Sequence, residues 1–177
     1  MNINESSLSR VWQHVKDNNK TIVIFTAFRD EYEYKDNIKH NKAFAAELKK
    51  AGFGYFYVNG FFPENEGTDK EVNVKEDSIF AIGSGEKGKE LISLCHKLAN
   101  SRNQDSIIVK EPTEKKTLYY FLNKDGSKSY ISEGLKVGKL GKYYTQLRNK
   151  KAANVFIFEN EHDGKGFFQS FREYLEN

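Results

Sequence analysis

The hydrophobic pattern is clearest between residues 76 and 111, where two short apolar runs flank a segment with helical spacing. Residues 78–82 and 106–109 are rich in β-branched and apolar side chains, as strands are. Between these runs, apolar residues recur every three or four positions: Leu91, Ile92, Leu94, Cys95, Leu98 and Ala99. The pattern predicts a strand, a glycine-containing loop, a helix that crosses a sheet, and a second strand. Glu76 opens the first of these strands and Glu111 closes the second.

The preceding part of the chain repeats the same order of elements. Residues 20–28 are almost continuously apolar, which predicts a central strand covered on both faces. A helix is expected over residues 37–51, because its apolar positions form one stripe and Gly52 can end it. Residues 53–62 form an aromatic-rich strand, in which Gly60 allows a bulge or a close backbone approach.

Further elements are predicted at both ends of the chain. Residues 6–18 have the stripe of a helix, with Ser6 or Ser7 as its cap. Residues 116–122 and 129–131 are expected to form a hairpin that turns at 123–126. The last predicted elements are a strand over 155–159, a turn at 163–164 and a short amphipathic helix over 167–175. Residues 63–75 lack periodicity and are long for a connection, which favours a functional loop.

The order strand, helix, strand, strand, helix, strand predicts an α+β fold of the ferredoxin-like, split βαβ kind. We expect an N-terminal helix over residues 1–19, the α+β core over 20–131, and a C-terminal strand and helix extension over 132–177. Together these parts are predicted to form a single domain, since 177 residues suit one well-buried core better than two.

Composition adds three constraints. Of the 177 residues, 14 are Phe and 10 are Tyr, so the core is expected to rely on aromatic side chains. Lys and Arg number 28 against 25 Asp and Glu, a net charge of +3 that argues against an unselective nucleic-acid binder. No stretch reaches the roughly 18 apolar residues of a membrane span, and the first residues lack a secretory signal, so a soluble, cytoplasmic protein without membrane contact is expected.

Cysteine and histidine offer little chemistry. The one cysteine, Cys95, falls on the apolar stripe of a predicted helix and is expected to be a buried thiol. The four histidines are scattered, without the spacing of a ligand pair, so no metal site is predicted.

A glycine-rich turn at residues 83–90 comes within one position of a phosphate-binding loop. That motif requires Ser or Thr where this chain has Glu90, whose carboxylate would disfavour a polyphosphate. The simpler interpretation is structural: the glycines let the chain turn, and Ser84 caps the following helix with Glu86 and Glu90 in its first turns.

Several short motifs resemble the S-adenosylmethionine lyases of phages and a related bacterial and phage domain family. The likeness extends over about residues 20–165. The residues that carry it are Thr26, Ala27, Phe28 and Arg29 after the first strand, Asn37 and Asn41 in the helix that runs to Leu48 and Gly52, Gly60, Glu76, Asp77 and Ser78, Gln104 and Asp105 before residues 107–109, and residues 155–159.

The resemblance implies a PII-like trimer with the ligand between subunits, and a lyase that needs no cofactor. S-adenosylmethionine carries both a sulfonium leaving group and a carboxylate nucleophile, whose attack on the γ carbon gives homoserine lactone and methylthioadenosine. Such an enzyme has to fold its substrate into the reactive geometry and exclude water. A glutamate can hold the substrate ammonium, and an aromatic face can stack on adenine or stabilise the cation.

By position, the resemblance implies Glu76 as the leading catalytic candidate and Glu111 as a second. It implies substrate contacts from Phe28, Arg29, Asn37, Phe62 and Gln104. Phe62 stands where the family has a tyrosine, so stacking is retained and a hydroxyl is lost. Structural interpretations stay open: Glu76 as an exposed strand glutamate, Arg29 as a surface charge and Asn37 as a helix cap.

Three functions remain open from the sequence. The first is an S-adenosylmethionine lyase that serves a phage against host restriction. The second is a non-catalytic module of the same fold that binds an adenine-containing ligand. The third is a phage structural or interaction protein. Turnover of S-adenosylmethionine would identify the first, and binding without turnover the second.

Overall fold

The computed structural model describes residues 13–29, 31–64, 69, 72–132, 135–137, 144–147 and 155–158; for residues 59–64, 72–76 and those from 131 onward it describes the backbone alone. A helical turn occupies residues 13–16. The other elements are β1 (Lys20–Phe25), α2 (Tyr34–Lys50), β2 (Gly54–Glu64), β3 (Val72–Ser84), α3 (Lys87–Ser101), β4 (Ser106–Pro112), β5 (Thr117–Asn123), β6 (Lys128–Ser132), β7 (Leu135–Val137), β8 (Tyr144–Leu147) and β9 (Val155–Phe158).

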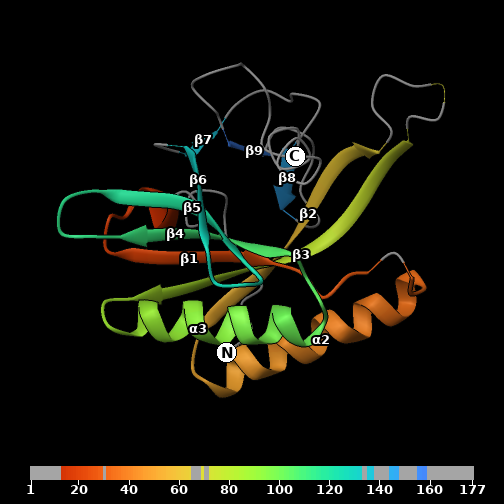
Figure 1. Ribbon diagram of the computed structural model, residues 1–177, viewed down its shortest axis with the longest axis horizontal. Coiled ribbons are helices and arrows are strands. Elements are labelled where there is room, and N and C mark those ends of the chain that lie inside the picture. Colours follow the sequence, from red (N-terminus) through yellow and green to blue (C-terminus); the bar gives the residue numbers. More distant parts are fainter. Residues whose placement is uncertain are drawn as a thin grey trace.

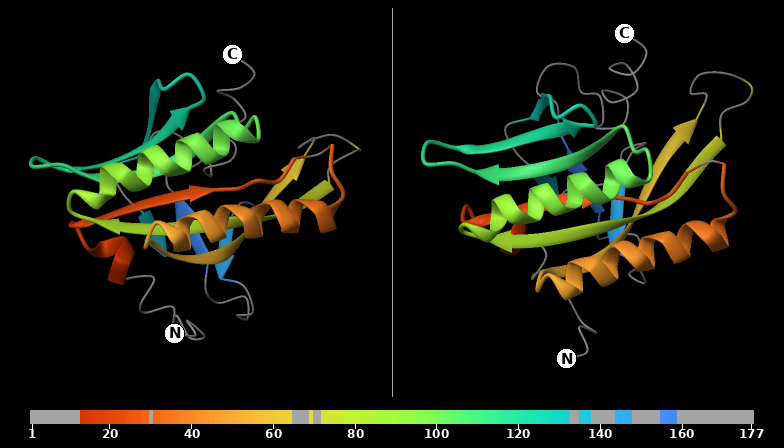
Figure 2. Two further views of the ribbon diagram at one scale, coloured as in Figure 1. Left: turned by 90° about the horizontal axis from the view of Figure 1, so that it is seen from below. Right: turned by 60° about the horizontal axis from the view of Figure 1, so that its bottom comes forward.

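The described strands form one sheet in the order β6-β5-β4-β1-β3-β2-β8-β9-β7. All pairs between neighbouring strands are antiparallel. Helices α2 and α3 cover one face of the central strands, as Figures 1 and 2 show. The predicted α+β class is confirmed, and the first six elements follow the predicted order of strand, helix, strand, strand, helix, strand.

The main core lies between this sheet face and the two helices. Val23 of β1 pairs with Ala81 of β3 and with Val109 of β4, which places these side chains on one face. Onto this face the helices pack six buried residues: Phe44, Ala45, Leu48, Leu91, Cys95 and Ala99. Cys95 is therefore a core thiol, as predicted, and burial raises its pKa.

Strands β2 and β3 are longer than the sequence pattern indicated. They pair without interruption from Gly54 opposite Ile82 to Glu64 opposite Val72. The expectation of a loop over residues 63–75 is wrong at both ends, because residues 63–64 and 72–75 belong to this ribbon. A bulge at Gly60 is also excluded, because Gly60 pairs in register with Glu76. Glu76 lies inside β3 rather than at its first residue.

The boundaries of β1 and α2 also differ from the prediction. Strand β1 ends at Phe25, not at residue 28, because the next residues turn toward α2. Helix α2 begins at Tyr34, and its cap residue Glu33 makes no side-chain capping bond. Asn37 is thus a buried residue within the first turns of the helix, and its interpretation as a cap is wrong.

Glycine 88 explains the glycine-rich turn structurally. It lies in the first turn of α3 against β1, where a Cβ atom would come within 2.2 Å of the Thr21 hydroxyl oxygen. Ser84 does not cap α3 as predicted: it ends β3 and accepts a hydrogen bond of 2.6 Å from Lys20, while Glu86 is the cap residue. The close approach of α3 to β1 therefore explains why glycine is needed here, and no phosphate ligand is required to account for it.

The hairpin of β5 and β6 confirms the predicted strand pair, and its turn includes Gly126 at φ 87°. Strand β9 confirms the strand predicted over 155–159. The predicted turn at 163–164, the helix over 167–175 and residues 6–12 of the N-terminal helix lie outside the described residues. Among the described helices, none combines the length and apolar character that a bilayer crossing requires.

Lys110 of β4 attaches the first helical turn to the sheet. Its side chain is buried, and its ammonium donates hydrogen bonds to the carbonyl oxygens of His14, Val15 and Asp17, at 3.2, 2.6 and 2.8 Å. Burial lowers the pKa of Lys110 to about 8, and the Asp17 charge offsets part of this effect. These carbonyl groups end the helical turn, so Lys110 acts as its C-terminal partner.

Substituting Gly88 by Ala is expected to destabilise the protein by about 1–3 kcal/mol, because the added methyl group overlaps Thr21. Denaturant unfolding measures this cost. Gly54→Ala is the matched control, since its Cβ would meet no atom within 4 Å. Adding Thr21→Ala to Gly88→Ala should restore part of the loss, and a Gly88→Ala protein as stable as the wild type would contradict the predicted overlap.

The lowered pKa of Lys110 predicts that stability rises at alkaline pH. Between about pH 8 and pH 10.4 the unfolded chain keeps a proton that the folded protein has lost, so the folded state gains stability with rising pH. Relative to Lys110→Met, the wild type should gain up to about 3 kcal/mol across this window. Unfolding both proteins at pH 7.5 and pH 10 tests this, and an unchanged difference between them would refute the lowered pKa.

Candidate functional site: the loop after strand β1

The segment from Thr26 to Arg29 leaves the sheet and is held by side chains rather than by strand partners. The amide N–H of Ala27 donates to Asn41 Oδ1 at 2.7 Å, and that of Phe28 donates to Thr26 Oγ1 at 3.1 Å. Buried backbone groups without partners are costly, so these side chains replace the hydrogen bonds that the strand no longer supplies. We call residues 26–29 the β1 loop.

Asn37 holds the end of the β1 loop. Its Oδ1 accepts the Arg29 amide N–H at 3.0 Å, and its Nδ2 donates to the carbonyl oxygens of Arg29 and Tyr32. Asn37 is only 5% exposed. A side chain so fully occupied with backbone groups positions the loop, and it presents few polar atoms to a ligand.

Gln104 reaches the β1 loop from the turn between α3 and β4. The chain leaves α3 through Asn103, which has a positive φ of 56°, and then enters β4. Across this turn, the Gln104 Nε2 donates to the carbonyl oxygen of Phe28, and the Arg29 Nη1 donates to that of Asn103 at 2.7 Å. The loop is therefore attached to α2 and to the turn after α3.

Arg29 already has an acidic partner. Its Nε lies 3.2 Å from each carboxylate oxygen of Glu31, and the Arg29 side chain is 26% exposed. The hydrogen bond from Arg29 lowers the pKa of the Glu31 carboxyl. The charge of this arginine is thus partly neutralised, and its guanidinium is directed along the loop.

Asp77 of β3 links the β1 loop to the sheet. Its carbonyl oxygen accepts hydrogen bonds from Thr26 Oγ1 at 2.8 Å and Asn41 Nδ2 at 2.6 Å. Asp77 is only 1% exposed. Its Oδ2 accepts a hydrogen bond of 2.9 Å from the Tyr34 hydroxyl. The Tyr34 ring also packs edge-on against Phe28, with centroids 5.6 Å apart.

Glu76 lies next to Asp77, and therefore adjoins the β1 loop through the backbone. Phe62 lies two residues beyond Gly60 on β2, and its register partner is Val74. The side chains of Glu76 and Phe62 lie outside the description. The backbone places both residues on the β2–β3 ribbon, which Asp77 links to the β1 loop.

Glu111 occupies a different environment. Its Oε2 accepts hydrogen bonds from the Tyr120 hydroxyl at 2.6 Å and Lys128 at 3.2 Å, and the Lys128 ammonium lies 4.4 Å from the Tyr120 ring centroid. Burial alone would raise the pKa of the Glu111 carboxyl, but these two hydrogen bonds outweigh it and lower the pKa. Burial and the bond to Glu111 raise the pKa of Tyr120.

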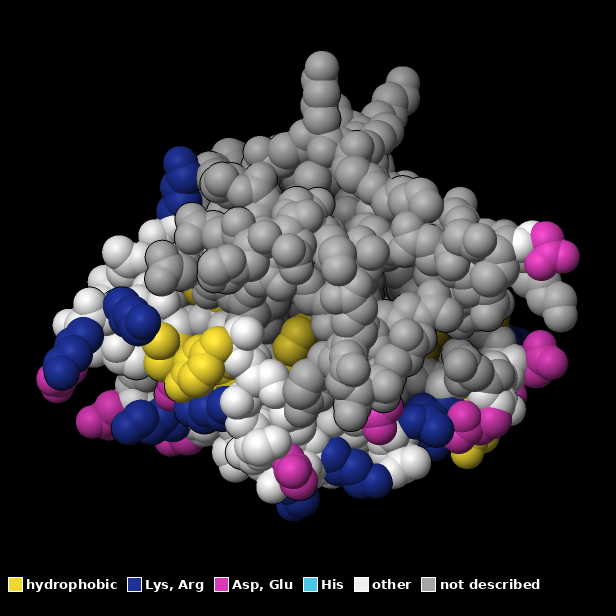
Figure 3. All heavy atoms as spheres, turned by 45° about the horizontal axis from the view of Figure 1, so that its top comes forward, with side chains coloured by type: hydrophobic (Ala, Val, Ile, Leu, Met, Phe, Trp, Pro, Cys, Tyr) yellow, Lys and Arg dark blue, Asp and Glu magenta, His cyan; other side chains and the backbone are white. Residues whose placement is uncertain are grey.

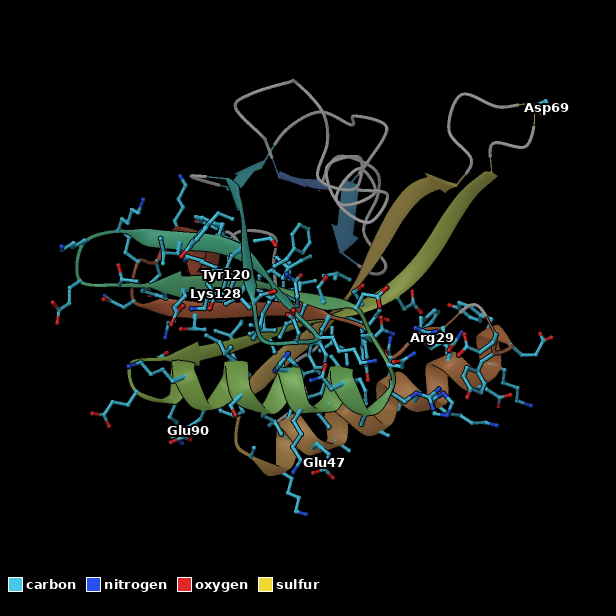
Figure 4. The ribbon with its side chains drawn as sticks, viewed as in Figure 1. Arg29, Glu47, Asp69, Glu90, Tyr120 and Lys128 are labelled. Atoms are coloured by element: carbon cyan, nitrogen blue, oxygen red, sulfur yellow. The ribbon has the colours of Figure 1, made fainter. Side chains whose placement is uncertain are left out.

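The two predicted catalytic carboxylates belong to opposite ends of the central strands. Strand β1 is antiparallel to both β3 and β4, so β3 and β4 run in the same direction. Glu76 lies in the first half of β3, and Glu111 lies near the end of β4. Strand geometry places them roughly 20 Å or more apart. Figure 4 shows this separation, with Arg29 far from Tyr120 and Lys128, the partners of Glu111.

The described residues offer neither a metal site nor a large charged surface as an alternative to the β1 loop. The described residues contain no group of three or more His, Cys, Asp or Glu side chains placed to hold a metal ion. On the face in Figure 3, described Lys and Arg side chains are interspersed with Asp and Glu, without a large surface of one sign.

The structure thus brings together four predicted substrate-binding residues, Phe28, Arg29, Asn37 and Gln104, and places Glu76 and Phe62 on the adjoining ribbon. The sequence analysis did not select Tyr34 or Asp77 as site residues, and it gave Asn41 no role. Asp77 directly follows Glu76, and Asn41 is one helical turn after Asn37, so the spacing i, i+4 was a usable signal for a shared face.

Removing the Asn41 amide is expected to destabilise the β1 loop. Asn41→Leu leaves the Ala27 amide without its acceptor and the Asp77 carbonyl with one donor fewer, in a region where Asn41 is 1% exposed. A cost of about 2–4 kcal/mol follows, with faster hydrogen exchange at Ala27. The neighbouring exposed position provides the control, Lys42→Ala, which should change stability by less than about 0.5 kcal/mol. Equal stability of the two variants would refute the role of Asn41.

Comparison with known proteins was made by sequence family and by structure. No curated protein matches the chain. Two solved structures are similar: a phage S-adenosylmethionine lyase in complex with S-methyl-5'-thioadenosine, at 15% identity and a TM-score of 0.30, covering 72% of this chain and 88% of the other; and a phage S-adenosylmethionine lyase in the apo state, at 14% and 0.31, covering 74% and 90%. Similarity at these TM-scores does not bear on the geometry of this chain.

The family comparison is more extensive. The model of the S-adenosylmethionine lyase family matches residues 23–166, a range that contains the β1 loop, the β2–β3 ribbon and both predicted glutamates. This match extends over most of the chain, and it agrees with the resemblance carried by the motifs around Thr26, Asn37 and Glu76. The chain belongs to the S-adenosylmethionine lyase family.

Proposed function

We propose that this protein cleaves S-adenosylmethionine to methylthioadenosine and homoserine lactone. The observation that carries the proposal is the family match over residues 23–166, which includes every residue proposed here to act on the substrate. The structure supports it with the β1 loop, whose backbone is held by side-chain hydrogen bonds beside the ribbon that contains Glu76.

The reaction is an intramolecular displacement within the substrate. An oxygen of the methionine carboxylate attacks the γ carbon and forms the lactone C–O bond. The bond between the γ carbon and sulfur breaks, and its electron pair stays on sulfur, which becomes a neutral thioether. No proton has to move and no cofactor is needed, so the protein accelerates the step by holding the reacting atoms in line and excluding water.

Glu76 is proposed to hold the substrate ammonium. A charge-assisted hydrogen bond from ammonium to carboxylate fixes the amino acid end of the substrate and leaves its carboxylate to react. Glu111 suits this role less well, because Lys128 already supplies it with a cation and Tyr120 with a hydrogen bond.

Arg29 contributes to the reaction because its guanidinium is already hydrogen-bonded within the protein. A free guanidinium would form a bidentate pair with the substrate carboxylate and suppress its nucleophilicity. The contacts within the protein engage two of the donor nitrogens of Arg29: Nε donates to the Glu31 carboxylate, and Nη1 donates to the Asn103 carbonyl oxygen. Asn37 and Gln104 act indirectly, since their amide groups hold the backbone of the loop.

The finer fold assignment is also a proposal. The strand order β4-β1-β3-β2 with both helices on one face supports a ferredoxin-like, PII-like core. We propose that three such chains assemble with the ligand between subunits, in the host cytoplasm, where loss of S-adenosylmethionine would protect a phage from restriction.

Assembly can be measured directly. A homotrimer should show three times the 20.5 kDa chain mass by light scattering at micromolar concentration. A monomer at that concentration would exclude a binding site between subunits.

Incubation with S-adenosylmethionine separates the possible functions. Release of methylthioadenosine and homoserine lactone identifies the lyase, whereas saturable binding without products identifies a non-catalytic module. A phage structural protein would show neither, and that result would end the enzymatic proposal.

A pair of isosteric substitutions tests the carboxylates. Glu76→Gln should lower turnover about tenfold to hundredfold, because it replaces a charge-assisted hydrogen bond of about 1.5–3 kcal/mol. Glu111→Gln is the matched control, which should keep turnover within about twofold and lose about 1 kcal/mol of stability from its contact with Lys128. Unchanged turnover in Glu76→Gln at an unchanged melting temperature would remove Glu76 from the reaction.

A further inference from the structure

Phe28 was the predicted aromatic contact in the β1 loop, but its ring has little surface to offer. Phe28 is 6% exposed, and its ring packs edge-on against Tyr34 with an interplanar angle of 79°. A buried ring cannot stack on a ligand without a rearrangement of its neighbours. Tyr34, by contrast, is 52% exposed.

The three most exposed large apolar residues among those described are Tyr32, Tyr34 and Tyr130. The Arg102 guanidinium lies 4.7 Å from the centroid of the Tyr32 ring, so that ring already has a cation. Tyr130 packs near Tyr120, in the cluster around Glu111 at the other edge of the sheet. The Tyr34 ring packs against the Phe28 ring of the β1 loop, whereas Tyr32 reaches this loop through its amide N–H, which donates to the Arg29 carbonyl oxygen at 3.1 Å.

A buried carboxylate fixes the exposed Tyr34 ring. The Tyr34 hydroxyl donates to Asp77 Oδ2 at 2.9 Å, and Asp77 is 1% exposed. The ring is therefore held by its T-shaped contact with Phe28 and by the hydrogen bond from its hydroxyl to Asp77. A phenol that donates to a carboxylate gains electron density in its ring, which strengthens the attraction of the ring face for a cation.

We infer that Tyr34 is the aromatic contact for the positively charged sulfonium of the substrate, with Asp77 as its positioning residue. This inference rests on the proposed function. The ring belongs to the residue that begins α2, and its partner Asp77 directly follows Glu76 in β3. The contact favours the charged substrate over its neutral thioether product, and thereby assists product release.

The test compares a cationic and a neutral ligand on the full-length protein. In Tyr34→Leu, KM for S-adenosylmethionine should rise about twofold to thirtyfold, the range for a cation–π contact, while the inhibition constant of methylthioadenosine changes by less than about twofold. Tyr34→Phe keeps the ring, loses the hydroxyl and should show a smaller rise. The control is Tyr130→Leu, which removes a tyrosine that is more exposed than Tyr34 and lies on the edge strand β6, and it should leave both constants unchanged.

The outcomes separate the inference from the proposed function. If the wild type turns over S-adenosylmethionine, but Tyr34→Leu leaves the ratio of KM to the inhibition constant of methylthioadenosine unchanged, the inference alone is overturned. An equal loss for both ligands also overturns it, because the ring would then stack on adenine. If the wild type binds without turnover, calorimetric dissociation constants replace KM in the same comparison. A wild type that neither binds nor cleaves S-adenosylmethionine overturns both.

Discussion

The buried backbone of the β1 loop is the constraint on which the rest of the site depends. Where β1 ends, the chain loses its strand partners but stays in the interior, so each amide group needs another acceptor. Asn41 and Asn37 of α2 supply two acceptors, and Gln104 supplies a donor from the segment after α3. The positions of both helices are thereby fixed relative to the end of β1, in addition to their apolar packing on the sheet.

In this arrangement polar contacts hold the β1 loop in place, and Glu31 partly neutralises the charge of Arg29. The contacts of Arg29 with Glu31 and Asn103 show how a guanidinium can serve the structure of the loop. Such a loop suits an intramolecular reaction, because the protein has to limit the substrate's conformations more than it has to supply reactive groups. The hydrogen bond from the Tyr34 hydroxyl to the buried Asp77 continues these polar contacts toward α2.

The sequence predicted the strongly periodic elements and missed those without a core face. Strands β1 and β4 and helix α3 carry apolar runs or stripes, so their existence and order were evident. Residues 63–64 and 72–75 of the ribbon were taken for a loop, because Pro63 and the polar Glu64, Asn73 and Lys75 interrupt any continuous apolar run there. Likewise, the need for glycine at Gly88 comes from a contact with Thr21, distant in sequence.

Prediction of the site followed the same division. Phe28, Arg29, Asn37 and Gln104 were named through the family resemblance, and the structure brings them together because Asn37 and Gln104 hydrogen-bond to the backbone of the β1 loop. Glu111 was grouped with Glu76 because these two glutamates open and close the predicted strand, helix and strand unit, but β3 and β4 run in the same direction, so the start of one and the end of the other lie at opposite ends of the strands. Asn37 was read as a cap because the sequence alone does not show that α2 begins at Tyr34.

The uneven lengths of the strands have an evolutionary consequence. Strand β3 pairs with β1 only from Ile79 to Ser84, whereas its pairing with β2 continues to Val72. The outer part of the ribbon is therefore independent of the register of the central strands. Matched insertions or deletions, of equal even length on both strands, would preserve which face each side chain occupies. The reach of this ribbon can thus diverge between relatives while the helix-covered core keeps its sequence pattern.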